Sequence, residues 1–325
     1  MSVYKTCFCG RFFLSALFFF LILGKNNKTR RAIKEKIVHT LILLHLAVFL
    51  AGWTGIFGRL ISLNGLPLVW YRMSISIVTL ALALVVMRRF HIPKWKKLIR
   101  IFACGCILAT HWVAFYASIQ ASNVSVGVAC IATTSFFTAL LNVFFNRKEA
   151  SWKEFVISFI SIVGVMLIFS LDVRYRLGIA LGLLCSLAYA VFALTHIKTA
   201  EKVGEDSATM LLYELVGGFS FLSLCIPLFL KLMPDAAILP TKTDAVWLLL
   251  LGSVFTVLPF LLQLHAFRRV SAFTVNLVYN LEPVYSIAFA AIIFNELQEL
   301  NWSFWLGIAL IVTSVVIQTI RVKDR

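Results

Sequence analysis

Charged residues are scarce in this chain of 325 residues: they make up only 14% of it, while 61% of the residues are hydrophobic. Because about a quarter of the residues of a soluble domain are charged, this composition excludes a soluble globular protein. Acidic residues are the scarcest, with 14 Asp and Glu against 30 Lys and Arg. The basic residues lie in short segments between apolar runs rather than on one folded face, so we predict no nucleic-acid partner.

The chain also lacks the motifs of common catalytic sites. It has no Gly-x-x-x-x-Gly-Lys-Ser/Thr loop for ATP, no Gly-x-Ser-x-Gly and no His-Glu-x-x-His. Its 7 cysteines form no Cys-x-x-Cys and its 6 histidines show no metal-ligand spacing, so we interpret the cysteines as small core residues. The sequence therefore predicts no bound metal, no cofactor and no enzyme.

Long apolar runs are what the chain has in abundance. Ten of them follow residue 37, each close to the ~20 residues that cross a bilayer. A single span must satisfy its own backbone hydrogen bonds, and the alternating pattern of barrel strands is absent, so each run is a predicted helix. The predicted spans are 38–58, 66–87, 98–118, 124–145, 153–170, 177–197, 208–230, 244–265, 270–294 and 302–320. The chain is thus predicted to be an all-α integral membrane protein with ten transmembrane helices.

Residues 1–36 form an extension before the first of these helices. Its apolar segment, Phe12–Leu23, is short for a span, and a basic run from Lys25 to Lys36 follows it. No small-residue cleavage site follows the apolar segment, so we predict that it is not a cleaved signal peptide. An extra short membrane segment, an interfacial helix and a translation start set too early all remain open.

The basic residues indicate how the helices are oriented. If the basic run before the first span is cytoplasmic, the even-numbered loops and the tail 321–325 are cytoplasmic too. Those segments hold most of the Lys and Arg, including Arg88 and Lys97, whereas the odd-numbered loops hold few, such as Arg59 and Lys231. Because Lys and Arg mark cytoplasmic loops, we predict both ends of the ten-helix unit in the cytoplasm, and a bacterial inner membrane as the location.

The chain repeats itself once. The segment Ser158–Gly164 resembles Gly307–Thr313, and a tryptophan opens the last predicted helix of each half. Five helices, in residues 37–170, are then followed by five related helices, in residues 177–320. Since an odd number of helices brings the second copy in from the opposite side, we predict an inverted repeat, as in secondary transporters with a site between the repeats.

One polar stretch, Asn276–Ser286, lies inside the apolar run 270–294. Glu282 is unfavourable there, because insertion scales assign a penalty of about 2.5–3.5 kcal/mol to aspartate, a related acid, at the centre of a membrane helix. The next residue, Pro283, removes a backbone donor and disturbs the helix. Irregular backbone at this depth survives only where it is buried in protein or lines a cavity, so we predict that this helix faces a solute path inside a helical bundle.

These residues resemble the EamA family of the drug/metabolite transporter superfamily. The resemblance covers about residues 37–320 and is carried by Leu281-Glu282-Pro283-Val284, Phe294-Asn295-Glu296, the counterpart ending at Lys148-Glu149, Gly52-Trp53, Arg72 and Tyr189. It implies two inverted five-helix repeats, a central cavity and transport of small metabolites, without implying one substrate. Ser135 departs from the family, because many members have proline there, and this predicts a fourth helix that is less broken than the ninth.

The candidate residues of the substrate pathway are Glu282, Asn280, Asn276, His111, Trp53, Tyr189, Glu214, Arg72 and Gln263. Glu282 either binds a cation or amine and carries a proton, or caps a broken helix. Asn276 and Asn280 are four residues apart and share a helix face, which meets either a solute or a neighbouring helix.

The other candidates also have two interpretations each. Arg72, near the start of the second helix, either extends to the membrane edge or binds an anionic substrate group. Glu214 is predicted at the opposite edge, which argues against a direct pair with Arg72 and favours a place on the cytoplasmic side of the pathway. His111 is either packed or part of a proton relay, whereas Trp53, Tyr189 and Gln263 either line a cavity or pack.

We therefore predict a secondary transporter that does not use ATP and moves small organic metabolites by alternating access. Export is the direction that the family resemblance favours. Coupling to protons or other ions, with Glu282 or Glu214 as carrier, and facilitated diffusion both stay open. The competing hypothesis is a membrane-embedded enzyme or lipid-processing protein that uses intramembrane Glu and His. The partners predicted are the metabolite and membrane lipid, with a homodimer left open.

Overall fold

The computed structural model describes residues 28–122, 124–145, 152–169, 176–293 and 302–323, and all the regular secondary structure in these ranges is helical. The prediction of an all-α protein is confirmed for this part of the chain. The chain divides into residues 1–39 and residues 40–325, and the contacts below are those of the second unit. The helices are α2 (Lys28–Ala51), α3 (Thr54–Leu60), α4 (Gly65–Val86), α5 (Trp95–Ala121), α6 (Val124–Ile131), α7 (Thr134–Phe145), α8 (Trp152–Phe169), α9 (Arg176–Val203), α10 (Ser207–Leu232), α11 (Lys242–Ser253), α12 (Val257–Phe267), α13 (Ala272–Tyr279), α14 (Glu282–Ile293) and α15 (Trp302–Lys323).

Six helical segments in the described ranges are long and apolar enough to cross a membrane: Val38–Leu60, Gly65–Val86, Trp95–Ala121, Arg176–Val203, Ser207–Leu232 and Lys242–Phe267. Their outward faces carry large apolar side chains, such as Val86 and Leu224, which are each 82% exposed. Such faces suit lipid rather than water. Two shorter apolar stretches of helix are Thr134–Phe144 and Trp305–Gln318.

Within the described ranges, four apolar stretches are interrupted by two or three non-helical residues, and two of them, Val38–Leu60 and Lys242–Phe267, belong to the six segments above. The interruptions are Gly52–Trp53 between α2 and α3, Ala132–Thr133 between α6 and α7, Val254–Thr256 between α11 and α12, and Asn280–Leu281 between α13 and α14. Prolines account for two of them, because Pro259 and Pro283 lie in the first turn of α12 and α14, where a missing backbone N–H breaks no helical bond.

The interruption between α6 and α7 corrects the expectation drawn from Ser135. The structure interrupts this segment by two residues, as it does the proline-containing segment later in the chain. Hydroxyl groups bond to carbonyls at the break: Thr133 Oγ1 donates to Cys130 O over 2.7 Å, beside the backbone N–H of the same residue, and Ser135 Oγ donates to Ala132 O over 3.3 Å. Serine and threonine can thus support a break that proline makes elsewhere, because their side chains compete for the same backbone groups.

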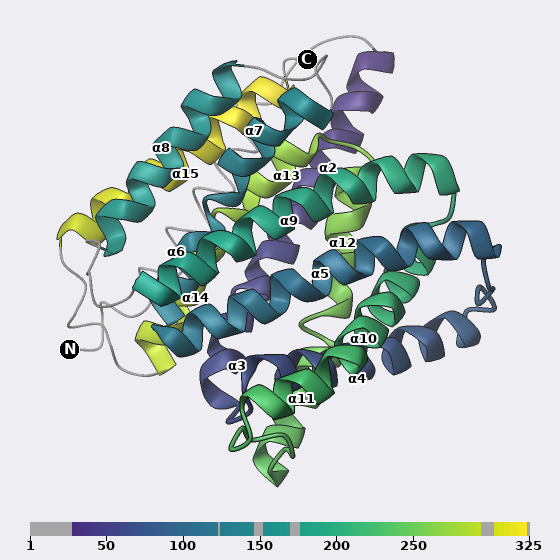
Figure 1. The fold of residues 1–325 in the computed structure, drawn as a ribbon. Helices are drawn as coiled ribbons and strands as arrows, with labels where there is room; N and C mark the ends of the chain where they lie inside the picture. The colour runs from purple at the N-terminus through teal and green to yellow at the C-terminus, as the bar shows by residue number, and fades with distance from the viewer. Residues whose placement is uncertain (1–27, 123, 146–151, 170–175, 294–301, 324–325) are drawn as a thin grey trace. The chain divides into compact units, whose positions relative to one another are not determined.

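The helices pack in reciprocal pairs (Figure 1). α4 contacts α11 and α5 contacts α10, while α7 lies against α13 and α8 against α15. Small residues permit the closest crossings. A Cβ on Gly164 of α8 would lie 2.7 Å from the backbone carbonyl oxygen of Gly307 in α15. A Cβ on Gly105 of α5 would clash with the backbone carbonyl oxygen of Glu214 in α10. The Oγ atoms of Ser161 and Ser314 also lie 2.5 Å apart across the α8–α15 contact. Such small-residue contacts are typical of helices packed within membranes.

Candidate functional site

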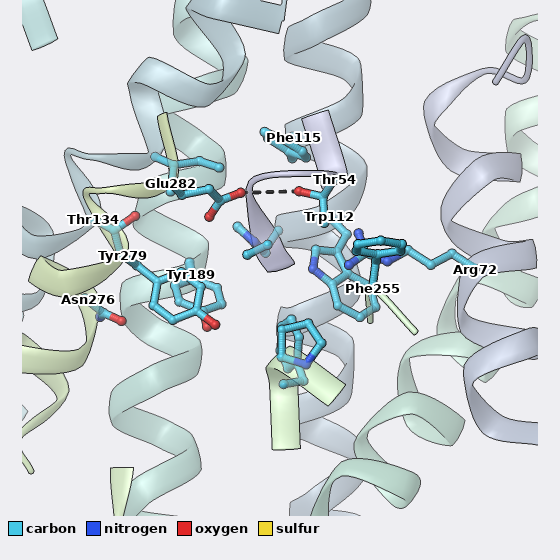
Figure 2. A pocket seen from close by; sticks show the side chains of 15 residues that line it. Thr54, Arg72, Trp112, Phe115, Thr134, Tyr189, Phe255, Asn276, Tyr279 and Glu282 are labelled. Carbon is cyan, nitrogen blue, oxygen red and sulfur yellow. Dashed lines mark hydrogen bonds between the residues drawn. The ribbon is translucent and has the colours of Figure 1, made fainter. Parts of the chain in front are cut away.

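A buried cavity of about 50 Å³ lies where the interrupted helices meet. Figure 2 shows its walls, which are formed by Ala51, Thr54, Arg72, His111, Trp112, Phe115, Ile131, Thr134, Tyr189, Phe255, Pro259, Phe260, Asn276, Tyr279 and Glu282. Each of the four interruptions contributes a residue or an immediate neighbour to this set. The cavity thus brings together helix ends, where backbone groups and side chains are free to meet a ligand.

Glu282 forms one wall of the cavity and is the first residue of α14. Only 6% of it is exposed, and its Oε1 accepts a hydrogen bond of 3.3 Å from Thr54 Oγ1 in α3. A carboxylate at this position is stabilised by the partial positive charge of the helix N-terminus. Glu282 therefore begins a broken helix and also lines the cavity, so its position fits either interpretation.

Arg72 of α4 forms the opposite wall (Figure 2). Its Nε donates to Thr256 Oγ1 over 2.8 Å, and its Nη1 donates to the Tyr116 hydroxyl over 3.1 Å. The guanidinium also lies 4.0 Å from the centre of the Trp112 ring, which places a cation over an aromatic face. Arg72 is only 2% exposed, so other side chains of the protein enclose its guanidinium.

Aromatic rings fill much of the remaining wall. The Trp112 and Phe260 rings meet edge to face at 5.1 Å, and the His111 and Tyr189 rings lie 4.5 Å apart. His111 also hydrogen-bonds through Nδ1 to Cys185 O over 3.0 Å, which fixes the orientation of its ring. These rings give the cavity a largely aromatic lining in addition to Arg72 and Glu282.

Three polar atoms on the cavity wall are buried and have no hydrogen-bond partner within the described residues: Thr134 Oγ1, Asn276 Oδ1 and the Tyr279 hydroxyl. The Asn276 side chain is otherwise held, because its Nδ2 donates to Thr138 Oγ1 over 2.8 Å. Buried polar groups normally find partners, so three without one around a single cavity indicate a place for a polar ligand or water.

The comparisons with known proteins agree with this architecture. The model of the EamA-like transporter family matches residues 38–170 and again residues 176–320. The chain belongs to the EamA-like transporter family. A solved structure titled only "Crystal structure of protein" aligns with a TM-score of 0.70 and 12% identity over 88% of this chain and 99% of that one, which shows a shared fold. No curated protein matches the sequence.

This family membership, together with the apolar helices, makes the protein an integral, multi-pass membrane protein and a transporter of the drug/metabolite type. Of the predicted pathway residues, the EamA-like transporter brings five to the cavity wall: Glu282, Arg72, His111, Tyr189 and Asn276.

Three other predicted residues lie behind the cavity wall and support it. The Gln263 side chain accepts a hydrogen bond of 2.5 Å from the Tyr189 hydroxyl. The amide of Asn280 meets Ser135 Oγ at 3.1 Å and so joins the interruptions of two different segments. The Trp53 ring stacks on Phe289 with a centroid distance of 4.5 Å, and its centroid lies 5.9 Å from that of the wall residue Phe255. These contacts position the walls rather than face the cavity.

Glu214 lies away from the cavity, in a buried pair with His196. Its Oε1 is 2.6 Å from His196 Nδ1, and the two residues are 0% and 1% exposed. The second oxygen, Oε2, has no partner among the described residues. Glu214 therefore pairs within the second half of the EamA-like transporter and does not contact Arg72.

Some wall residues had no strong signal in the sequence. Thr54, Thr134 and Phe255 lie in apolar runs, where they are indistinguishable from packing residues. The proline at 259 was the available signal for Thr256 and Phe255, because it marks an interruption just before it. The cavity residues of the EamA-like transporter come together through these interruptions, which periodicity alone does not reveal.

Proposed function

We propose that this EamA-like transporter exports a small organic metabolite by alternating access, without ATP, between two inverted five-helix halves. The observation that carries the proposal is the cavity between Arg72 and Glu282, which is surrounded by helix interruptions. Discontinuous helices around a central site are a feature of secondary transporters, because helix ends offer binding groups and points of bending.

The pattern of helix contacts supports two related halves. We number the proposed spans one to five within each half. The second span of the first half contacts the third span of the other half, through α4 and α11. The third span of the first half contacts the second span of the other half, through α5 and α10. The fourth spans meet each other through α7 and α13, and the fifth spans through α8 and α15. Reciprocal contacts of this kind are expected of a twofold relation, and an odd number of spans per half makes that relation an inverted one.

The size of the cavity supports a mechanism that involves movement. A volume of about 50 Å³ has room for a few water molecules and is small for an organic metabolite. Loading and release then require the walls to separate, and residues at the ends of helices are where such bending concentrates. We propose that the interruptions at Gly52–Trp53, Ala132–Thr133, Val254–Thr256 and Asn280–Leu281 act as these hinges.

Two polar networks are proposed to close the pathway at its two ends. In the first, Glu205 lies 2.7 Å from both His91 Nε2 and Lys97 Nζ, so it joins the loop before α10 to the loop before α5 and to the first turn of α5. In the second, the carboxylate of Asp244 accepts bonds of 2.8 and 2.7 Å from Ser62 N and Oγ. We assign the first network to the cytoplasmic face of a bacterial inner membrane, with the ends of the ten-helix unit on the same side, because the basic loops cluster there.

Metabolite profiles test the proposal. Compounds inside and outside cells are compared for a strain lacking the protein, a strain expressing it and a strain expressing Glu282→Gln, with Glu201→Gln, an exposed substitution on α9, as the matched control. We expect at least one compound to accumulate outside only with the intact protein and with the control. Accumulation inside would reverse the direction, and unchanged profiles in every strain would contradict transport of cellular metabolites and favour the membrane-enzyme alternative.

A further inference from the structure

Arg72 is held in place by neutral groups. A guanidinium has five N–H donors, and Thr256 and Tyr116 each take one of them. The Trp112 ring supports its face. Within the described residues Arg72 forms no ion pair within 4.0 Å, although it is buried inside a membrane-spanning segment, and the carboxylate that acts on its charge, Glu282, stands across the cavity.

This arrangement resembles a binding site for an anion more than a structural contact. A structural arginine in a membrane pairs with a carboxylate or reaches the interface, and Arg72 does neither. Its planar fork is oriented by Tyr116 and Trp112 of α5 and by Thr256 of the segment Lys242–Phe267, and among the described residues it retains N–H donors without a partner at the cavity wall. Such a fork is suited to bind a carboxylate through two parallel hydrogen bonds.

The balance of charge limits the ligand further. Arg72 and Glu282 stand on different sides of the cavity, as Figure 2 shows, and together they leave it neutral. An anion bound at Arg72 leaves Glu282 as an unbalanced charge unless an ammonium group of the same solute or a proton compensates it. The unpartnered atoms of Asn276 and Tyr279, which come from the α13 side next to Glu282, offer further polar contacts there.

We propose that Arg72 is the anion anchor of this cavity, and that the substrate class is a small organic acid with a carboxylate and a flat apolar body. The carboxylate binds the guanidinium of Arg72, and the body lies against the rings of Trp112 and Phe260. This inference rests on the transport function proposed above and specifies the class of solute that the cavity takes.

Binding to the full-length protein in lipid nanodiscs tests the anchor. The probes are benzoate, which carries a carboxylate on a ring, phenylglycine, which adds an ammonium group, and benzamide, the uncharged counterpart of benzoate. We expect benzoate or phenylglycine to bind about tenfold or more tightly than benzamide, because a hydrogen bond to a charged group outweighs one to a neutral group. Equal binding of all three, or binding of none, overturns the proposal in the unmodified protein.

Variants then assign the effect to Arg72. Arg72→Gln should abolish the preference for the carboxylate, Arg72→Lys should retain part of it, and Arg176→Gln, an exposed substitution at the start of α9, should retain all of it. A preference that survives in Arg72→Gln refutes the anchor. Preference for phenylglycine identifies an ammonium as the group that balances Glu282, whereas tighter benzoate binding at lower pH identifies a proton.

The two proposals can fail separately. If the carboxylate probes bind through Arg72 but no compound moves in cells or proteoliposomes, the anchor stands and the transport function fails. If cells export a compound and Arg72→Gln leaves that export unchanged, the transport function stands and the anchor fails.

Discussion

The buried pair of His196 and Glu214 allows a test in which magnitude separates two physical states. The hydrogen bond is 2.6 Å long and both side chains are sealed from solvent. If the pair is ionised, removing one member leaves an uncompensated buried charge, and the free energy of unfolding should fall by about 3–5 kcal/mol. If both groups are neutral, the bond is an ordinary membrane hydrogen bond, for which double-mutant cycles average about 0.6 kcal/mol.

We expect each single removal to cost at least about 1–3 kcal/mol, because both side chains are sealed from solvent and the remaining partner is left buried without its hydrogen bond. The variants are His196→Leu, Glu214→Leu and the double variant, and the free energy of unfolding is measured in mixed micelles. A loss near ~1–3 kcal/mol fits a buried polar group left unpaired and one of about 3–5 kcal/mol fits a buried charge, while the double change should recover most of either loss because no unpaired polar group remains. Glu201→Gln, exposed on the same helix as His196, serves as the control.

An additive outcome would refute this reasoning. If the double variant loses the sum of the two single losses, the groups do not compensate each other, and the cost belongs to lost packing. A loss below about 1 kcal/mol in each single variant would show a neutral bond instead. The first result contradicts the pairing and the second contradicts its ionised form.

Three further predictions concern other parts of the molecule. The hydrogen bond to Glu205 raises the pKa of His91 above its usual value of 6.5. The stability that His91 adds should therefore be complete below pH 6.5 and be lost as the pH rises through the raised pKa. Thermal unfolding measured against pH, with His91→Gln as reference, checks this. Asp244→Asn should lower stability by about 1–2 kcal/mol through loss of the capping box that begins α11, which denaturant unfolding measures. Gly164→Ala should lower the free energy of unfolding by about 1–3 kcal/mol, because the new Cβ would lie 2.7 Å from the backbone oxygen of Gly307 and push α8 away from α15. Unchanged stability in denaturant unfolding would show that the two helices can move apart without cost.

Much of the fold followed from the distribution of apolar residues. The helices of the structure lie over the apolar runs, because backbone groups in a membrane can be satisfied within a single span only by a helix. Local patterns were less reliable at the breaks. Pro283 marked one of them, whereas the break before Ser135 was underestimated, since hydroxyl groups rather than proline support it.

The candidate site could be predicted only in part. Glu282 and Arg72 stood out because a charge inside an apolar run is costly and therefore informative. Thr256 and Tyr116, which hold Arg72, carried no such signal, because placing a hydroxyl group in a membrane helix costs little free energy and such residues are common there. Likewise, nothing local indicated that His196 would pair with Glu214, since the two lie on different helices.

By itself, the sequence determined that this is a helical membrane protein with an acid at a broken helix, because apolar length, charge and proline act locally along the chain. The tertiary structure alone decided which of these features meet. It placed Arg72 and Glu282 on two walls of one cavity, buried Glu214 elsewhere, and turned Asn280 and Gln263 into supports. These outcomes depend on how helices cross and on which side chains fill the space between them, and such contacts join residues far apart in the chain.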